Sequence, residues 1–240
     1  LQTGVNAGEQ MSVGFDSVKS KDIGMGAQAA LSSVGGRYNA SATNAEFTAF
    51  TSGSLLLNGV AVGASLATDD SASFANAAAS AIAKVAAINR VADQSGVSAK
   101  VGATVVGGAR MTNAQTASFH FTINGVNTAE ITTTGDTSVS RSRVVSAINA
   151  ISNQTGVTAI DTQDDNQGVV LKAADGRNIT VADSLGTSAA DSAAVTGVSV
   201  AKVNAADSSE ATTYVGSYDL FTKDGSSFTV DQAFNSIDAQ

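Results

Sequence analysis

Two stretches of the chain share one pattern of apolar and polar positions. Each is a run of β-forming residues that meets an Asn-Gly dipeptide and then continues: Leu55–Val62 around Asn58-Gly59, and Phe119–Val126 around Asn124-Gly125. Asn-Gly supplies two residues with positive φ, as a two-residue type I′ turn requires. The pattern therefore predicts two β-hairpins.

Each hairpin is followed by a helical pattern and then by strands. The first helix is predicted over Phe74–Asp93, where apolar residues recur every three or four positions, and Gly96 is placed to end it. The second helix is predicted over Val139–Gln154, before Thr155-Gly156. Strands are predicted after the two helices over residues 97–101, 103–106, 157–162, 169–173 and 178–181.

The two segments resemble copies of one module, because three short motifs occur in the same order in both. These are Asn58-Gly59-Val60 and Asn124-Gly125-Val126, Ala87-Ile88-Asn89 and Ala147-Ile148-Asn149, and Gly96-Val97 and Gly156-Val157. The first pair is 66 residues apart and the other two pairs are 60 residues apart. The difference places a six-residue insertion in the first copy, around residues 68–73.

The second hairpin contains a conflict of register. A two-residue turn pairs Ile123 with Val126, which puts Thr128 and Glu130 on the core face and Ile131 on the opposite face. A β-bulge or a longer turn would restore the apolar register. An irregularity is therefore predicted near Thr128.

The predicted fold class is α+β, with two small modules of β-hairpin, helix and β-hairpin, and β-rich segments that lead back to a shared base. Four regions are expected. They are a base strand and connecting segment (1–53), the first module (54–110), the second module (111–183), and return strands with the start of a further helix (184–240).

The segments outside the modules carry weaker patterns. Residues 10–15 are predicted as an extended strand, and 25–34 as a short helix closed by Gly35-Gly36. A strand is predicted over 198–203, a hairpin between 211–221 and 228–230, and an amphipathic helix over 229–240.

Composition limits the kinds of molecule that this chain is expected to bind. The net charge is −8, the sequence pI is near 4.4, and no cluster of Lys and Arg occurs. Nucleic-acid binding and polybasic membrane attachment are therefore disfavoured, and the uncharged apolar stretches are shorter than the roughly 20 residues of a spanning helix. The absence of Cys excludes disulfides, thiolate zinc sites and cysteine nucleophiles.

Few residues are candidates for chemistry. His120, the only histidine, lies between Phe119 and Phe121 and is expected to face outward from a strand, without the partner that a catalytic base needs. Asp161–Gly168 is the most metal-like stretch, but its spacing does not fit a calcium loop, and Asp, Asn and Gly are ordinary turn residues. A hairpin turn is favoured there over weak cation binding.

The other charged or glycine-rich positions have structural explanations. Asp69-Asp70 is expected to cap the first helix. Arg141 and Arg143 are expected to be solvated, and Gly107-Gly108 is too short a signal for phosphate binding. No catalytic, cofactor or metal site is predicted, and the chain is not expected to be an enzyme.

The second copy resembles the hook-IN motif of bacterial flagellins. The matching residues are Phe121-Thr-Ile-Asn-Gly-Val126, Val145-Ser-Ala-Ile-Asn149, Thr155-Gly-Val157, Val169-Val-Leu171 and Gly176. The first copy matches more loosely, with Leu57 for the Ile and Ala103-Thr-Val-Val106 for the later strand. Residues 1–13 resemble the stretch where a flagellin chain leaves the filament core, and residues 234–239 resemble the start of its C-terminal core helix.

The resemblance implies a structural protein: the surface-exposed outer part of flagellin, secreted into the extracellular flagellum and serving motility. Its partners would be other flagellin subunits, which associate mainly through terminal core helices that residues 1–240 lack, so this fragment is expected to be monomeric. Absence of Cys, Pro and Trp suits a subunit that is exported unfolded.

A secreted surface-binding or adhesin module is the alternative. In that reading the exposed strands, rich in Thr, Ser and Asn, recognise glycans or a host surface. The low aromatic content of 5% is unfavourable to it, since sugar sites favour aromatic stacking platforms.

Overall fold

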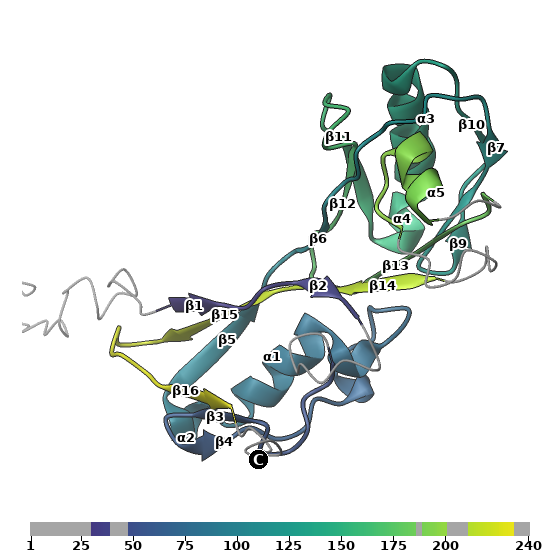
Figure 1. The fold of residues 1–240 in the computed structure, drawn as a ribbon. Coiled ribbons are helices and arrows are strands. Elements are labelled where there is room, and N and C mark those ends of the chain that lie inside the picture. The colour runs from purple at the N-terminus through teal and green to yellow at the C-terminus, as the bar shows by residue number, and fades with distance from the viewer. Residues whose placement is uncertain (1–29, 39–47, 186–188, 201–210, 233–240) are drawn as a thin grey trace, which may run out of the picture.

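The computed structural model describes residues 30–38, 48–185, 189–200 and 211–232. They form two bodies, one above the other in Figure 1, each with a helix packed against short strands. Each body has its own buried cluster: one contains Ile88 and the other Ile148. The body around Ile88 is called the first module below, and the body around Ile148 the second module. The predicted α+β fold class is confirmed.

The helices and strands alternate along the chain. The helical elements are η1 (Ala67–Asp69), η2 (Ala77–Ala79), α1 (Ala81–Asn89), α2 (Ala92–Ser95), α3 (Thr137–Ala150), α4 (Ser152–Thr155) and α5 (Ala189–Thr196). The strands are β1 (Ala30–Ser32), β2 (Gly36–Arg37), β3 (Leu55–Leu57), β4 (Val60–Ala61), β5 (Val97–Val101), β6 (Thr104–Val106), β7 (Ser118–Phe119), β8 (Phe121–Ile123), β9 (Val126–Asn127), β10 (Ile131–Thr132), β11 (Thr158–Asp161), β12 (Val169–Ala173), β13 (Ile179–Asp183), β14 (Thr212–Val215), β15 (Tyr218–Thr222) and β16 (Val230–Gln232).

Both predicted Asn-Gly hairpins are present. Asn58 and Gly59 have φ of 50° and 77° between β3 and β4, and Asn124 and Gly125 have φ of 47° and 81° between β8 and β9. Four positive φ values are what two type I′ turns require. The predicted turn positions are confirmed.

The predicted bulge in the second hairpin is confirmed. The β8–β9 register pairs Ile123 with Val126, which if continued would place Phe119 opposite Glu130. In the structure Phe119 instead pairs with Ile131, so one extra residue lies in the second strand opposite His120. The shift brings Ile131 into the core beside Phe119.

The first helix starts later than predicted. Asn76 adopts a left-handed φ of 54°, which interrupts the helical spacing, and Ser80 Oγ accepts a hydrogen bond from the N–H of Ala83 (3.1 Å) as the N-cap of α1. The predicted start at Phe74 is therefore wrong, and Phe74 is exposed. The predicted helix-ending glycines are confirmed, because Gly96 and Gly156 adopt the left-handed conformation with φ of 71°. They follow the short helices α2 and α4, however, since α1 itself ends at Asn89 and α3 at Ala150.

The strand pairings differ from the prediction that 97–101 and 103–106 form a hairpin. β5 pairs with β15, and β6 leaves the first module to pair with β12 of the second. The chain therefore crosses between the modules at residues 102–103, inside the region assigned to the first module from sequence.

The first module is completed by residues 218–232. β15 pairs with β5 as β12 pairs with β11, and β16 pairs with β3 as β13 pairs with β8. Val181 lies opposite Ile123 and Val230 lies opposite Leu57, and these two valines are 49 residues apart. At the same spacing, five identities relate the two segments: Leu171 and Leu220, Asp175 and Asp224, Gly176 and Gly225, Thr180 and Thr229, and Val181 and Val230.

Apart from β2, which precedes β3 in the sequence and pairs with β14 at the edge of the second module's sheet, the second module is thus inserted within the first. In the sequence, all of the elements from β6 to β14 come between β5 and β15. In space, β5 and β15 are adjacent strands of one sheet. Gly102 donates its N–H to the carbonyl of Ser217 (2.9 Å), so the two crossing points are neighbours. The two modules are nested in the sequence.

Three further predictions are corrected. Residues 30–32 of the predicted helix 25–34 form strand β1, which pairs with β15. The predicted hairpin between 211–221 and 228–230 is absent because β1 and β5 occupy both edges of β15. Residues 230–232 of the predicted helix 229–240 form strand β16, while 233–240 lie outside the described residues.

The segment between β13 and β14 also differs from the prediction of a strand over 198–203. Val198 and Val200 are buried, but residues 198–200 form no strand, and 201–203 lie outside the described residues. Helix α5 was not predicted, because its sequence is dominated by Ala, Ser, Asp and Thr.

The insertion of the first copy forms the contact between the modules. Asn178 of the second module is fully buried, and its amide donates to the carbonyls of Ala75 and Asn76 (both 3.0 Å). Its N–H donates to Ser73 Oγ (2.8 Å), and the ring of Phe74 lies against Gly125. These contacts fix one module against the other.

Candidate functional site

His120 is part of the strand framework. It is half-buried beside the bulge, its N–H donates to Ser184 Oγ (2.9 Å), and its carbonyl accepts the N–H of Ser184 (3.0 Å). Its neighbours Phe119 and Phe121 are buried and stack edge-to-face at 5.4 Å. His120 thus lies on the opposite side of the strand from these rings, and no hydrogen bond of its imidazole is found within the described residues.

The acidic stretch Asp161–Gly168 forms a turn. Asp161 Oδ1 accepts the N–H of Gln163 (2.8 Å), and Asp164 Oδ1 accepts the N–H of Asn166 (2.8 Å). The hydrogen bond from the Asn166 backbone, followed by that from its side chain, holds the pKa of Asp164 below its usual value. The carboxylates are therefore used to shape the turn that joins β11 to β12.

Arg141 is buried, so the prediction that it is solvated is wrong. The residue is 4% exposed, and its guanidinium donates to Asp161 Oδ1 (2.8 Å) and to Asp165. Burial by itself would lower the pKa of Arg141, but the bonds to the two carboxylates outweigh it and raise the pKa. Arg141 thus ties helix α3 to the acidic turn. Arg143 is exposed, as predicted, and donates to the carbonyl of Thr132 (2.7 Å).

The prediction that Asp69 and Asp70 cap the first helix is wrong, because they bind backbone N–H groups that precede α1. Asp70 is buried and accepts the N–H groups of Ala72 (2.8 Å) and Ser73 (3.0 Å), as well as the hydroxyl of Ser73 (2.5 Å). Asp69 pairs with Arg90. Asp70 therefore holds the turn that carries Ser73 and Phe74 to the second module.

Of the glycine pair, Gly108 has a packing role, whereas a Cβ at Gly107 would have no neighbour within 4 Å. A side chain at Gly108 would collide with the backbone of Gln167 and Val169. Within the described ranges, no group of three or more His, Asp or Glu side chains is arranged to hold a metal ion.

The turn asparagines of the two modules make side-chain hydrogen bonds that the sequence did not predict. Asn58 Nδ2 donates to the carbonyl of Ser95 (2.7 Å), and Asn58 Oδ1 accepts the N–H of Thr229 (2.8 Å). In the second module Asn124 makes the same pair of bonds to Thr155 (2.9 Å) and Thr180 (2.8 Å). Each turn asparagine thus joins three elements: the hairpin, the end of the helix and the last strand.

The helix asparagines cap the edge of a strand. Asn89 accepts the N–H of Ala99 (2.8 Å) and donates to its carbonyl (3.1 Å). Asn149 makes the same two bonds to Ala159 (2.7 and 3.0 Å). These side chains satisfy backbone groups that an edge strand would otherwise leave open for pairing with another chain.

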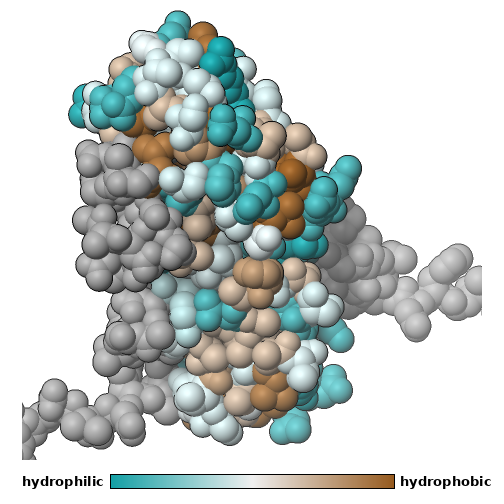
Figure 2. All heavy atoms as spheres, turned by 90° about the vertical axis from the view of Figure 1, so that its right-hand side faces the viewer, coloured by the Kyte–Doolittle hydropathy of each residue, from teal (hydrophilic) through white to brown (hydrophobic). Residues whose placement is uncertain are grey.

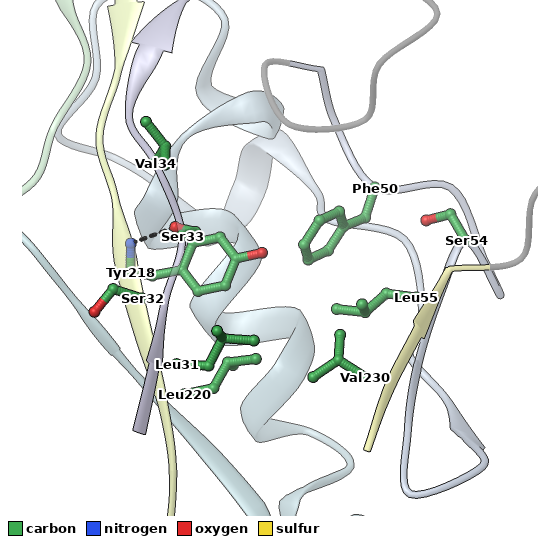
Figure 3. Close-up of a pocket in the computed structure, with 10 residues that line it drawn as sticks. All are labelled: Leu31, Ser32, Ser33, Val34, Phe50, Ser54, Leu55, Tyr218, Leu220 and Val230. Atoms are coloured by element: carbon green, nitrogen blue, oxygen red, sulfur yellow. Dashed lines mark hydrogen bonds between the residues drawn. The ribbon is translucent and has the colours of Figure 1, made fainter. Parts of the chain in front are cut away.

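The first module contains a groove with a largely apolar lining. It lies between β1 and β15 on one side and β3 and β16 on the other, with a volume of about 220 Å³ (Figure 3). Its lining residues are Leu31, Ser32, Ser33, Val34, Phe50, Ser54, Leu55, Tyr218, Leu220 and Val230. These lining residues are aliphatic, aromatic or hydroxyl-bearing, so the groove is suited to binding apolar groups.

Elsewhere the surface is mixed. On the face shown in Figure 2, hydrophobic residues occur in small groups among hydrophilic ones. None of the helices in the described ranges is long and apolar enough to cross a membrane.

Comparison with known proteins adds no assignment. No protein-family model matches the chain, and no curated protein matches it significantly.

Proposed function

We propose that this chain is the outward-facing part of a bacterial flagellin, a structural subunit of the extracellular filament that serves motility. Its partners in the filament are other flagellin subunits, which it joins through segments beyond the two modules. In this role the modules supply a folded, stable surface and perform no reaction.

Support comes from the architectural roles of four equivalent motif residues in each module. In both modules the hairpin asparagine joins three elements, the helix isoleucine lies in the core, the helix asparagine caps a strand edge, and the glycine ends the helix. A sequence whose repeated residues all serve packing and hydrogen bonding is suited to a structural subunit.

The nesting of the modules is also suited to this role. β1 and β16, the first and last described strands, both belong to the first module, whereas the strands of the second module other than β2 lie between β5 and β15 in the sequence. The first module is then the side nearer to a filament core, and the second module lies farther out.

The experiment is antibody labelling of filaments. Antibodies raised against residues 1–240 should decorate filaments sheared from the source bacterium along their whole length in electron micrographs, and deletion of the coding region should abolish motility. Filaments that remain unlabelled while the protein is found elsewhere on the cell would refute the proposal. In that case a glycan-array screen would test the alternative of a surface-binding module.

A further inference from the structure

The two modules differ at one strand edge. In the second module β13 is an inner strand, with β8 on one side and β14 on the other. In the first module the corresponding strand β16 pairs with β3 and is the last strand of its sheet in the described part of the chain. The first module therefore has an open edge where the second has a strand.

The open edge borders the apolar groove. Val106 and Leu31 occupy equivalent positions, since each lies opposite the equivalent leucine, Leu171 or Leu220. Val106 is 2% exposed, within a core to which Val198, Val200 and Tyr214 contribute, whereas Leu31 is 49% exposed. The groove is thus a core position that the described residues of the first module leave uncovered.

The backbone of β16 is oriented to receive a strand. Thr229 directs its N–H and carbonyl toward Asn58, as Thr180 does toward Asn124. Because successive residues of a strand point their polar groups to opposite sides, the N–H and carbonyl of Val230 point away from β3. Val181, its equivalent, uses that side to pair with Thr212 of β14. An exposed edge with an apolar groove beside it accepts an extended segment by β-strand addition.

We propose that residues 10–15 of this chain, Gln-Met-Ser-Val-Gly-Phe, are the segment that adds to β16 and fills the groove. Met11, Val13 and Phe15 alternate with small or polar residues, so one face of a strand is apolar. Residues 1–29 lead directly into β1, which is a wall of the groove. The 14 residues from 16 to 29 can span about 45 Å when fully extended, and β1 and β16 both line the same groove.

An intramolecular strand is favoured over a strand from a second copy. A tethered segment is present at an effective concentration of the order of millimolar. A second copy would have to meet a surface of the same sign, because each chain has a net charge of −8. Docking of residues 10–15 is independent of the flagellin proposal, since it rests only on the comparison of the two modules.

Amide hydrogen exchange tests the docking. In residues 1–240 the N–H of Val230 should exchange about tenfold or more slowly compared with a variant that lacks residues 1–20, while the N–H of Val85 in α1 should be unchanged and so report that the module is folded. Equal exchange of Val230 in the two proteins would overturn the proposal. Slow exchange that appears only at high protein concentration, together with a dimer in sedimentation, would also overturn it in favour of a second copy.

A matched pair of substitutions locates the contact. Val13→Asp should accelerate exchange of the Val230 N–H about as much as the deletion does, whereas Val18→Asp, outside the segment, should not. Because the chain has no Cys, a spin label on Ser12→Cys is attached at one site only. It should broaden the Val230 resonance, and a Val230 resonance that stays sharp would overturn the proposal.

Discussion

Replacing Asn124 tests whether the turn asparagines hold the modules together. In the structure Asn124 has a left-handed φ of 47°, its amide donates to the carbonyl of Thr155 (2.9 Å), and its Oδ1 accepts the N–H of Thr180 (2.8 Å). Asn124→Gly removes both side-chain bonds and keeps a residue that adopts positive φ freely. Asn124→Ala removes the same bonds and adds the cost of a Cβ in the left-handed region.

The expected losses follow from these contacts. Each hydrogen bond contributes about 1 kcal/mol net, so Asn124→Gly should lower the free energy of unfolding of the second module by about 2 kcal/mol. Asn124→Ala should cost about 1 kcal/mol more, because left-handed strain exceeds the gain from a less flexible unfolded chain. At about 3 °C per kcal/mol, the melting temperature should fall by about 6 °C and about 9 °C.

Urea denaturation and calorimetry measure these changes, with Asn153→Ala, at an exposed position of α4, as the control that should leave stability unchanged. If Asn124→Gly is as stable as the unaltered protein, the two hydrogen bonds contribute nothing and the assigned role of Asn124 is wrong. If Asn124→Gly is less stable than Asn124→Ala, the left-handed conformation is not what the turn requires.

Four further outcomes follow from the fold. Replacing residues 103–216 by Asn-Gly should leave a folded first module, because Gly102 and Ser217 already form a hydrogen-bonded pair that a two-residue turn can close; loss of cooperative unfolding would contradict the nesting. Ile148→Asp should unfold the second module by burying an unpaired charge in its core, and unchanged thermal unfolding would show that Ile148 is misplaced. Arg141→Met should cost about 1–3 kcal/mol in urea denaturation, because it removes hydrogen bonds to two carboxylates; equal stability would show that the pairs contribute nothing. Burial tends to raise the pKa of Asp70, but its hydrogen bonds lower it overall. Its contribution to stability is therefore full above the unfolded pKa near 3.9 and is lost as the pH falls through the folded value, so an Asp70→Asn variant should show a weaker dependence of stability on acid pH.

Local signals in the sequence predicted the local structure well. The Asn-Gly turns and the glycines after the helices follow from backbone preferences that act within a few residues. The bulge near Thr128 follows from the alternation of side chains across a strand, because only a shift of one residue returns Ile131 to the core. These features need no knowledge of the rest of the chain.

Predictions failed where a distant segment decides the environment. Arg141 stands at the start of a helix in a polar sequence, and nothing local shows that the acidic turn 20 residues later folds over it. Residues 103–106 and 228–230 were recognised as strands, but their partners lie far away in the sequence. The identities between 169–183 and 218–232 carried that information, and they are visible only once the pairings show where to align them.

For this protein, the sequence by itself determined the parts: two hairpins with Asn-Gly turns, two helices with glycine ends, one bulge, and an α+β class. The tertiary structure decided how the parts are joined. Strands 218–222 and 230–232 complete the first module from beyond the second, where β15 pairs with an edge of β5 and β16 pairs with an edge of β3. A strand's propensity is local, whereas its partner depends on which edges remain unpaired when the whole chain has folded.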